Sequence, residues 1–282
     1  ILGEQVTAYR GYMMECPDIL TIDGQDVLMF SPQGLPAQGD RLQNIHNTGY
    51  VLGKFDSTSG SFEVTSDFEE LDQGFEFYAS QTLHHAGRHL LWGWAGMMPS
   101  DREKTLPTRQ AGWAHVLSLP RELHVLDGRL TSRPVKEVYE QLLGDRLEAH
   151  ADENGTFFIV PNNAYYTDMH LADDDDFTML IATGTNPANG NSMELQLQRR
   201  DGVTRLVTKG TVVDDIDFDS GIADVRRVEI FFDRNVVEVF LNNGEAAGSM
   251  LFQGADGDGE FRFVADGKVD CVDVRVLDSI WR

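Results

Sequence analysis

The fold class is set by residues 228–241, which read VEIFFDRNVVEVFL. Apolar residues recur at every second position on both sides of the turn Asp233-Arg234-Asn235. This is the period of a β-strand that buries one face. β-branched and aromatic residues dominate both runs, as is typical of strands. The stretch therefore predicts two half-buried antiparallel strands joined by a short turn.

The same pattern continues along most of the chain. Met193, Leu195 and Leu197 alternate with polar residues, and the apolar run 27–30 ends at the turn residues Ser31-Pro32-Gln33-Gly34. The aromatic run 89–94 follows a glycine turn. Many short strands with frequent turns predict an all-β fold, either a sandwich or a propeller-like arrangement.

One segment has a helical period instead. In residues 134–150, PVKEVYEQLLGDRLEAH, the apolar positions Val135, Val138, Leu142 and Leu143 lie near helical spacing after a proline that favours a helix start. We expect a short helix over 135–143 that links two all-β units. The predicted division is 1–136, a linker at 137–149, and 150–282.

The composition excludes several classes of partner. The chain has 282 residues, is 41% hydrophobic and carries a net charge of −23. A field of that sign repels nucleic acid and anionic membrane surfaces, so neither is expected as a partner. No apolar run approaches the roughly 20 residues of a membrane span. The sequence leaves open whether the protein forms a homo-oligomer.

The two cysteines and the start of the chain bear on compartment and completeness. Cys16 and Cys271 show neither a disulfide framework nor metal-ligand spacing, which favours a reducing compartment, the cytoplasm. Residues 1–10 have no initiator methionine, charged n-region or apolar h-region. The chain is therefore expected to be the interior of a longer protein, whose targeting segment would lie upstream.

Neither a metal nor a cofactor is expected. His84, His85 and His89 lie close in sequence, but no carboxylate or cysteine completes a ligand set at useful spacing. The acidic run 173–176 lacks the spaced ligands of a calcium loop and is interpreted as a solvated turn.

A series of motifs then follows in one order along the chain. The series begins with Met14-Glu15-Cys16-Pro17-Asp18 and continues with SPQG (31–34), NTGYVLG (47–53), LDQGFEFYASQT (71–82), GWAGM (93–97), GWAH (112–115), LSLPREL (117–123), GRL (128–130) and RPVKE (133–137). In this order the motifs resemble those of glycoside hydrolase family 32, which contains invertases, sucrose-6-phosphate hydrolases, inulinases and levanases. Residues 228–245 are similar to the C-terminal β-sandwich of that family.

The resemblance implies a fold and a reaction. Family members pair a five-bladed β-propeller with a β-sandwich, so residues 1–136 would form roughly the last half of the propeller and 150–282 the sandwich. The reaction is retaining hydrolysis of a terminal β-fructofuranosyl residue by two carboxyl groups. The acid/base of the family is the glutamate of the Glu-Cys motif, which corresponds to Glu15.

The chain departs from the family in lacking the nucleophile. The family's nucleophilic aspartate lies in an Asn-Asp-Pro motif, and a second aspartate that stabilises the transition state lies in an Arg-Asp-Pro motif. Neither tripeptide occurs here. Both are expected upstream, in an N-terminal remainder of the same protein that would be a partner of these residues. The chain alone is expected to be inactive.

The resemblance also implies sugar contacts. Tyr78 and Trp94 lie in motifs that approach the active centre, and Cys16 is expected to line the same pocket. Asp18 and Gln33 are further candidates. Thr82 and its neighbour Gln81, together with Arg121, are expected to fix loops by hydrogen bonds.

Alternatives remain open for the substrate and for the reaction. Sucrose, sucrose 6-phosphate and fructo-oligosaccharides are all candidate substrates. Arg102, Lys104 and Arg109 could bind a phosphate, or could form a solvated cluster. Fructosyl transfer and a non-catalytic carbohydrate-binding fragment are the alternative functions.

Overall fold

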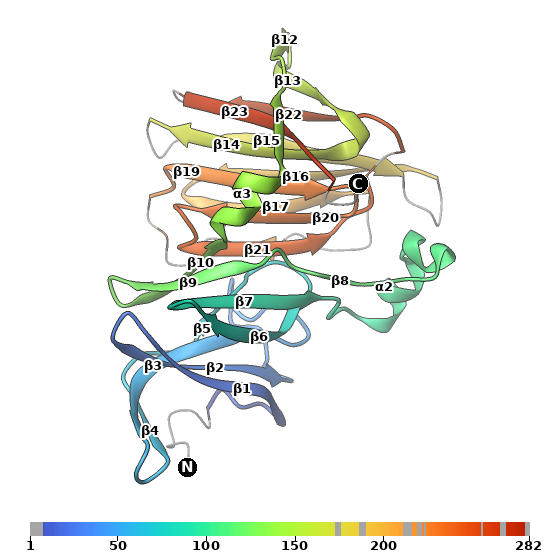
Figure 1. The fold of residues 1–282 in the computed structure, drawn as a ribbon. Helices are drawn as coiled ribbons and strands as arrows, with labels where there is room; N and C mark the ends of the chain where they lie inside the picture. The colour runs from blue at the N-terminus through green and yellow to red at the C-terminus, as the bar shows by residue number, and fades with distance from the viewer. Residues whose placement is uncertain are drawn as a thin grey trace.

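The computed structural model describes residues 8–172, 176–185, 190–210, 216–218, 222, 224–254, 256–265 and 269–279. Strands make up nearly all of the regular structure in these ranges, which confirms the all-β prediction (Figure 1). Residues 173–175 of the acidic run lie outside the described residues.

Two antiparallel sheets form the first half of the chain (Figure 1). The first has the order β1 (Met13–Ile22), β2 (Gln25–Gln33), β3 (Gly49–Asp56) and β4 (Ser61–Val64), with β5 (Glu69–Glu70) also pairing with β3. The second has the order β6 (Phe77–His85), β7 (Arg88–Ala95), β9 (Arg121–Leu126) and β10 (Arg129–Pro134), with β8 (Val116–Leu117) on β7. Each is an up-and-down sheet of four main strands, the architecture of a propeller blade.

The two blades share one apolar core. It joins Ile22, Val27, Met29, Tyr50 and Leu52 of the first blade to Phe77, Leu91, Leu123 and Leu130 of the second. Strands β1 and β6, the first strands of their blades, lie at the sheet edges, and hydroxyl groups of β6 donate hydrogen bonds to carboxylates of β1. In a propeller the edges of successive blades surround the central channel. Polar residues on β1 and β6 are therefore placed at this axis.

A projecting excursion connects β7 to β8 (Figure 1). It contains α2 (Ser100–Thr105) and the 3-10 helix η1 (Pro107–Ala111). The predicted helix linking the two units is α3 (Lys136–Leu142), which follows β10 directly. The helical period in the sequence thus located it to within one residue at either end.

The second half is a sandwich of two antiparallel sheets. One has the order β11 (Leu143–Arg146), β23 (Val269–Leu277), β14 (Ala164–Leu171), β19 (Arg227–Asp233), β20 (Val236–Leu241) and β21 (Ala246–Leu251). The other has the order β12 (His150–Asp152), β13 (Gly155–Val160), β22 (Gly259–Ala265), β15 (Phe177–Thr185), β16 (Ser192–Arg200), β17 (Val203–Lys209) and β18 (Ile216–Asp217), with the 3-10 helix η2 (Pro161–Asn163) after β13.

Strands β19 and β20 have the alternation that the sequence predicts. Their residues Val228, Ile230, Phe232, Val237, Val239 and Leu241 are all fully buried in the core between the sheets. The prediction that these strands are half-buried is wrong, however, because Glu229, Phe231, Glu238 and Phe240 on the opposite face are also at most 4% exposed. Helix α3 packs on Phe231 through Tyr139, and the second blade reaches Glu238 through Arg121.

Three further observations concern the described residues. None of the helices in these ranges is long and apolar enough to span a membrane. No cluster of three or more His, Cys, Asp or Glu side chains in these ranges is arranged to hold a metal ion; the rings of His84 and His89 stack on each other at 4.7 Å instead. Both cysteines are free thiols.

Candidate active site

Glu15 lies at a bulge in β1. Glu15 pairs with Ser31 of β2, but the next paired residue is Asp18, which opposes Met29, so the ladder slips between them. Cys16 adopts a left-handed backbone conformation with φ of 46°. Pro17 has no N–H to donate to the ladder, which favours an irregularity here. Bulges re-aim side chains next to active sites, and this one orients Glu15 at the edge of its blade.

A second bulge lies opposite, in β6. Tyr78 pairs with Trp94 of β7, and regular pairing resumes only at Gln81. Ala79 has φ of 49°, also left-handed. The two edge strands at the blade axis are thus both distorted at the residues that the family motifs single out.

The two bulges bring Glu15 and Tyr78 together. The Tyr78 hydroxyl lies 3.1 Å from Glu15 Oε2 and 3.1 Å from the Ser31 carbonyl oxygen, and it can donate to either. The ring is 1% exposed, whereas Glu15 is partly exposed. Burial, with a contribution from the Glu15 carboxylate, raises the pKa of Tyr78 well above its usual value. The hydroxyl therefore keeps its proton and acts as a donor to the glutamate.

Trp94 of β7 is the residue that pairs with Tyr78 of β6. Directly paired residues of antiparallel strands place their side chains on the same face, so Trp94 lies on the face of the sheet that carries Tyr78. The Trp94 ring packs edge-on against His115, with centroids 5.0 Å apart. A Cβ at Gly96 would lie 2.4 Å from the Trp94 ring and 2.7 Å from the His115 ring. Only glycine fits there without moving both rings.

Gln33 and His46 also lie close to Tyr78. The Gln33 side chain forms a hydrogen bond with Tyr78 that opposes the rise in the pKa of its hydroxyl. His46 pairs with Gln33 through an isolated bridge, and its ring lies 5.9 Å from the Tyr78 ring. The Gly34 N–H donates to His46 Nδ1 over 3.2 Å. Sequence reasoning missed His46, although it stands just before the motif at 47–53.

Cys16 and Asp18 differ in their surroundings. Cys16 is partly buried, and charge on its sulfur makes the smallest of the named contributions that raise the pKa of Tyr78, so the sulfur lies near the Tyr78 hydroxyl. Asp18 is held by the Thr82 hydroxyl, which donates to its carboxylate across the two blades. The sequence predicts that Thr82 fixes a loop, whereas its hydroxyl joins two strands, β6 and β1, and engages Asp18.

The candidate phosphate ligands are paired with carboxylates. Arg102 lies 2.5 Å from Glu76 and also donates to the Leu251 carbonyl oxygen. Lys104 lies 3.0 Å from Asp101, and Arg109 lies 2.5 Å from Glu103. Arg102 is thereby part of the contact between the second blade and the sandwich.

Comparisons with known proteins place these motifs in one family. The model of the glycosyl hydrolases family 32 N-terminal domain matches residues 2–134, and that of the family 32 C-terminal region matches residues 184–278. The sucrose-6-phosphate hydrolase of Bacillus subtilis is 32% identical over 268 residues, which cover 92% of this chain and 53% of that protein.

Solved structures agree with the sequence matches. A family 32 glycoside hydrolase from Bifidobacterium adolescentis is 46% identical with a TM-score of 0.83, covering 95% of this chain and 42% of that one. A variant of the Bombyx mori β-fructofuranosidase in complex with sucrose is 25% identical with a TM-score of 0.80, covering 95% of this chain and 55% of that one. The chain thus spans about half the length of these relatives. It belongs to glycoside hydrolase family 32.

Proposed function

We propose that this chain supplies the acid/base side of the active site of a retaining β-fructofuranosidase, with Glu15 as the acid/base. One observation carries the proposal. Glu15 and Tyr78, on separate blades and each at a bulge, meet through a hydrogen bond at the edge that would face the propeller axis. A partly exposed carboxyl group beside a neutral donor and aromatic rings is suited to proton transfer to a sugar.

The proposed substrates carry a terminal β-fructofuranosyl residue. They are sucrose, sucrose 6-phosphate and fructo-oligosaccharides. The Bacillus subtilis relative is named a sucrose-6-phosphate hydrolase, and the Bombyx mori relative binds sucrose. Tyr78, Trp94, Cys16 and Gln33 would bind the sugar, and Asp18 would do so at the edge of the site.

In the first step Glu15 would protonate the oxygen of the leaving sugar. The hydrogen bond from Tyr78 fixes Oε2, so we assign the proton transfer to Oε1. An aspartate of an upstream Asn-Asp-Pro segment would attack the anomeric carbon. In retaining enzymes the two carboxyl groups lie about 5–5.5 Å apart. In the second step Glu15 would take a proton from water, which then releases fructose from the covalent intermediate.

The division of the chain follows from this assignment. Residues 1–136 would be part of the catalytic propeller, 137–149 its connection, and 150–282 the sandwich. We propose that the chain alone does not turn over substrate, because this sequence has no Asn-Asp-Pro motif to form the intermediate.

The test uses the full-length protein and two substrates. Glu15→Gln should lower kcat/KM for sucrose by about 10²–10⁴-fold, but kcat/KM for nitrophenyl β-fructofuranoside far less, because kcat/KM reports the formation of the covalent intermediate and this leaving group departs without a proton. Glu63→Gln, an exposed glutamate of the same blade, is the control and should change neither rate. Equal losses on both substrates in Glu15→Gln would contradict the acid role.

Product analysis separates hydrolysis from the alternatives. Glucose and fructose in equal amounts at high sucrose support hydrolysis, whereas excess free glucose with longer fructosides indicates fructosyl transfer. A full-length protein that binds sugar but releases neither product would be a carbohydrate-binding protein.

A further inference from the structure

We infer that Arg121 is a positioning residue for the acid/base: its contacts with the sandwich and with Phe77 hold Tyr78 against Glu15. The inference rests on the proposed function of Glu15. By this inference the sandwich helps to hold the active-site residues of the blades in place.

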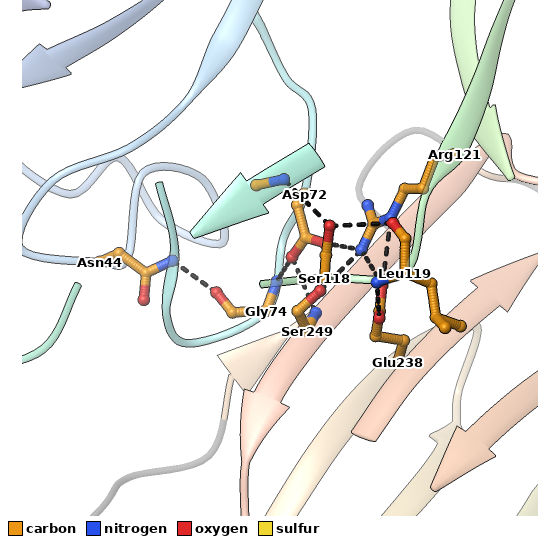
Figure 2. A network of polar contacts seen from close by, with 9 residues as sticks. Asn44, Asp72, Gly74, Ser118, Leu119, Arg121, Glu238 and Ser249 are labelled. Carbon is orange, nitrogen blue, oxygen red and sulfur yellow. Dashed lines mark hydrogen bonds and ion pairs between the residues drawn. The ribbon is translucent and has the colours of Figure 1, made fainter. Parts of the chain in front are cut away.

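Arg121 stands at the centre of a buried charge cluster (Figure 2). Its Nη2 atom lies 2.8 Å from Asp72 Oδ2, 2.6 Å from Glu238 Oε2 and 2.7 Å from Ser249 Oγ. Arg121 and Asp72 belong to the second blade and the segment before it, whereas Glu238 and Ser249 belong to β20 and β21 of the sandwich. All four residues are at most 4% exposed. The cluster therefore connects the two halves of the chain through buried side chains.

The segment before β6 is bound to the sandwich like an additional strand. The N–H groups of Gln73 and Phe75 donate to the carbonyl oxygens of Ala247 and Ser249 over 2.7 and 2.8 Å. The carboxylates of Asp72 and Glu76 in turn accept from the N–H groups of Ser249 and Leu251, each over 2.8 Å. These bonds satisfy the free edge of β21, which ends its sheet.

Close packing confirms how tightly this segment is held. A Cβ at Gly74 would lie 2.1 Å from the carbonyl oxygen of Ser249 and 2.2 Å from its nitrogen. The Asn44 amide also donates to the Gly74 carbonyl oxygen over 2.5 Å, from the first blade (Figure 2). The segment is thus fixed by both blades and by the sandwich just before β6 begins.

Arg121 fixes the position of Tyr78 through its contact with the Phe77 ring. The guanidinium carbon lies 4.8 Å from the centroid of the Phe77 ring and 4.9 Å from that of Phe240. Gly93 also packs tightly on the Phe77 ring, because a Cβ at Gly93 would lie 2.0 Å from that ring. Phe77 is the residue immediately before Tyr78. A shift of the guanidinium would therefore displace the backbone that carries the Tyr78 hydroxyl.

A buried ion cluster is better at fixing the positions of side chains than at stabilising the fold. Buried ion pairs gain little over apolar packing because desolvation offsets their attraction. Their hydrogen bonds have strict directions, however, and the guanidinium fork fixes carboxylates in one geometry. Small misplacements of catalytic groups cost large factors in rate.

The experiment measures the ratio of kcat/KM for sucrose to kcat/KM for nitrophenyl β-fructofuranoside in the full-length protein, well below the unfolding temperature, because kcat/KM reports only the step in which the acid acts. Loss of stability alone lowers both rates together, whereas a misplaced acid lowers only the rate that needs a proton. The variants are Arg121→Met and the milder Ser249→Ala, which removes one ligand of Arg121. Arg199→Met is the matched control, because Arg199 is also buried, at 1% exposed, but lies in β16 of the sandwich.

We expect the ratio to fall about tenfold in Arg121→Met and severalfold in Ser249→Ala, and to stay at the wild-type value in Arg199→Met. An unchanged ratio in Arg121→Met and Ser249→Ala overturns the positioning role but leaves Glu15 as the acid. If Arg121→Met does not fold, Ser249→Ala decides by the same criterion. If Glu15→Gln itself leaves the ratio unchanged, the proposed function fails, and this inference fails with it.

Discussion

The Tyr78 hydroxyl lies 3.1 Å from Glu15 Oε2, although the two residues are 63 positions apart and belong to different blades. The same hydroxyl lies 3.1 Å from the Ser31 carbonyl oxygen. Tyr78 is therefore the residue that connects the edges of the two blades at the candidate site.

Removing the Tyr78 hydroxyl should lower kcat strongly and the unfolding free energy only slightly. In Tyr78→Phe, Glu15 loses its donor, and we expect kcat on sucrose to fall by about 10–100-fold. The unfolding free energy should drop by only about 1–2 kcal/mol, the effect of leaving one buried acceptor without a partner. Steady-state kinetics and urea unfolding measure the two effects. A kcat equal to that of the wild type would contradict the role of this contact.

Glu70 should make stability depend on pH. Its Oε2 atom accepts from the Leu42 N–H over 2.9 Å, but loss of hydration outweighs this bond and raises the pKa of Glu70 to about 7, from 4.5. Folding thus favours the protonated form. The contribution of Glu70 to stability is full below about pH 4.5 and is lost as the pH rises through about 7.

Thermal unfolding between pH 5 and 8 tests this expectation. Glu70→Gln cannot ionise, so its Tm should rise relative to that of the wild type as the pH increases. Glu63→Gln, which replaces an exposed glutamate of the same blade that is not among the charges acting on Glu70, is the control and should follow the wild-type pH profile. Parallel profiles for Glu70→Gln and the wild type would refute the assignment.

The ion cluster around Arg121 should be sensitive to the loss of one member. Arg121→Met leaves Asp72 and Glu238 buried without their cation and should lower the unfolding free energy by about 3–5 kcal/mol. Adding Asp72→Asn and Glu238→Gln removes these charges and should recover part of the loss. Chemical denaturation measures the unfolding free energies of the wild type, of Arg121→Met and of the combined variant. A combined variant that is less stable than Arg121→Met would contradict this account.

Gly96→Ala should disturb the Trp94 ring. The added methyl group would lie 2.4 Å from that ring, so the side chain must move. We expect KM for sucrose to rise about tenfold, because aromatic faces contribute to sugar binding. Gly128→Ala, where a Cβ meets nothing within 4 Å, should cost about 1 kcal/mol of stability through its φ of 77° and leave KM unchanged. An unaltered KM in Gly96→Ala would exclude Trp94 from the binding site.

Local periodicity predicted much of the fold. The alternation at 228–241 identified β19 and β20, and the spacing from Val135 to Leu142 identified α3. The burial of Glu229 and Glu238 could not be predicted from the same pattern, because α3 and the second blade cover their face only after folding. A polar residue that alternates with apolar ones along a strand can equally well face the solvent or form a buried ion pair.

The sequence predicted the individual residues of the candidate site, but not how they are arranged in space. Motif order singled out Glu15 and Tyr78, whereas their contact depends on two bulges and on the packing of two blades. Pro17 was the one local signal for the first bulge. His46 was missed because nothing in its neighbourhood indicates that it lies 5.9 Å from the Tyr78 ring.

The most direct test of the central claim is chemical rescue of Glu15→Ala in the full-length protein. Without its base, the covalent fructosyl-enzyme should accumulate, and azide, a nucleophile that needs no deprotonation, should release it. The account predicts that azide restores turnover of nitrophenyl β-fructofuranoside and yields fructosyl azide in the β configuration. No rescue by azide, or a product in the α configuration, would contradict it.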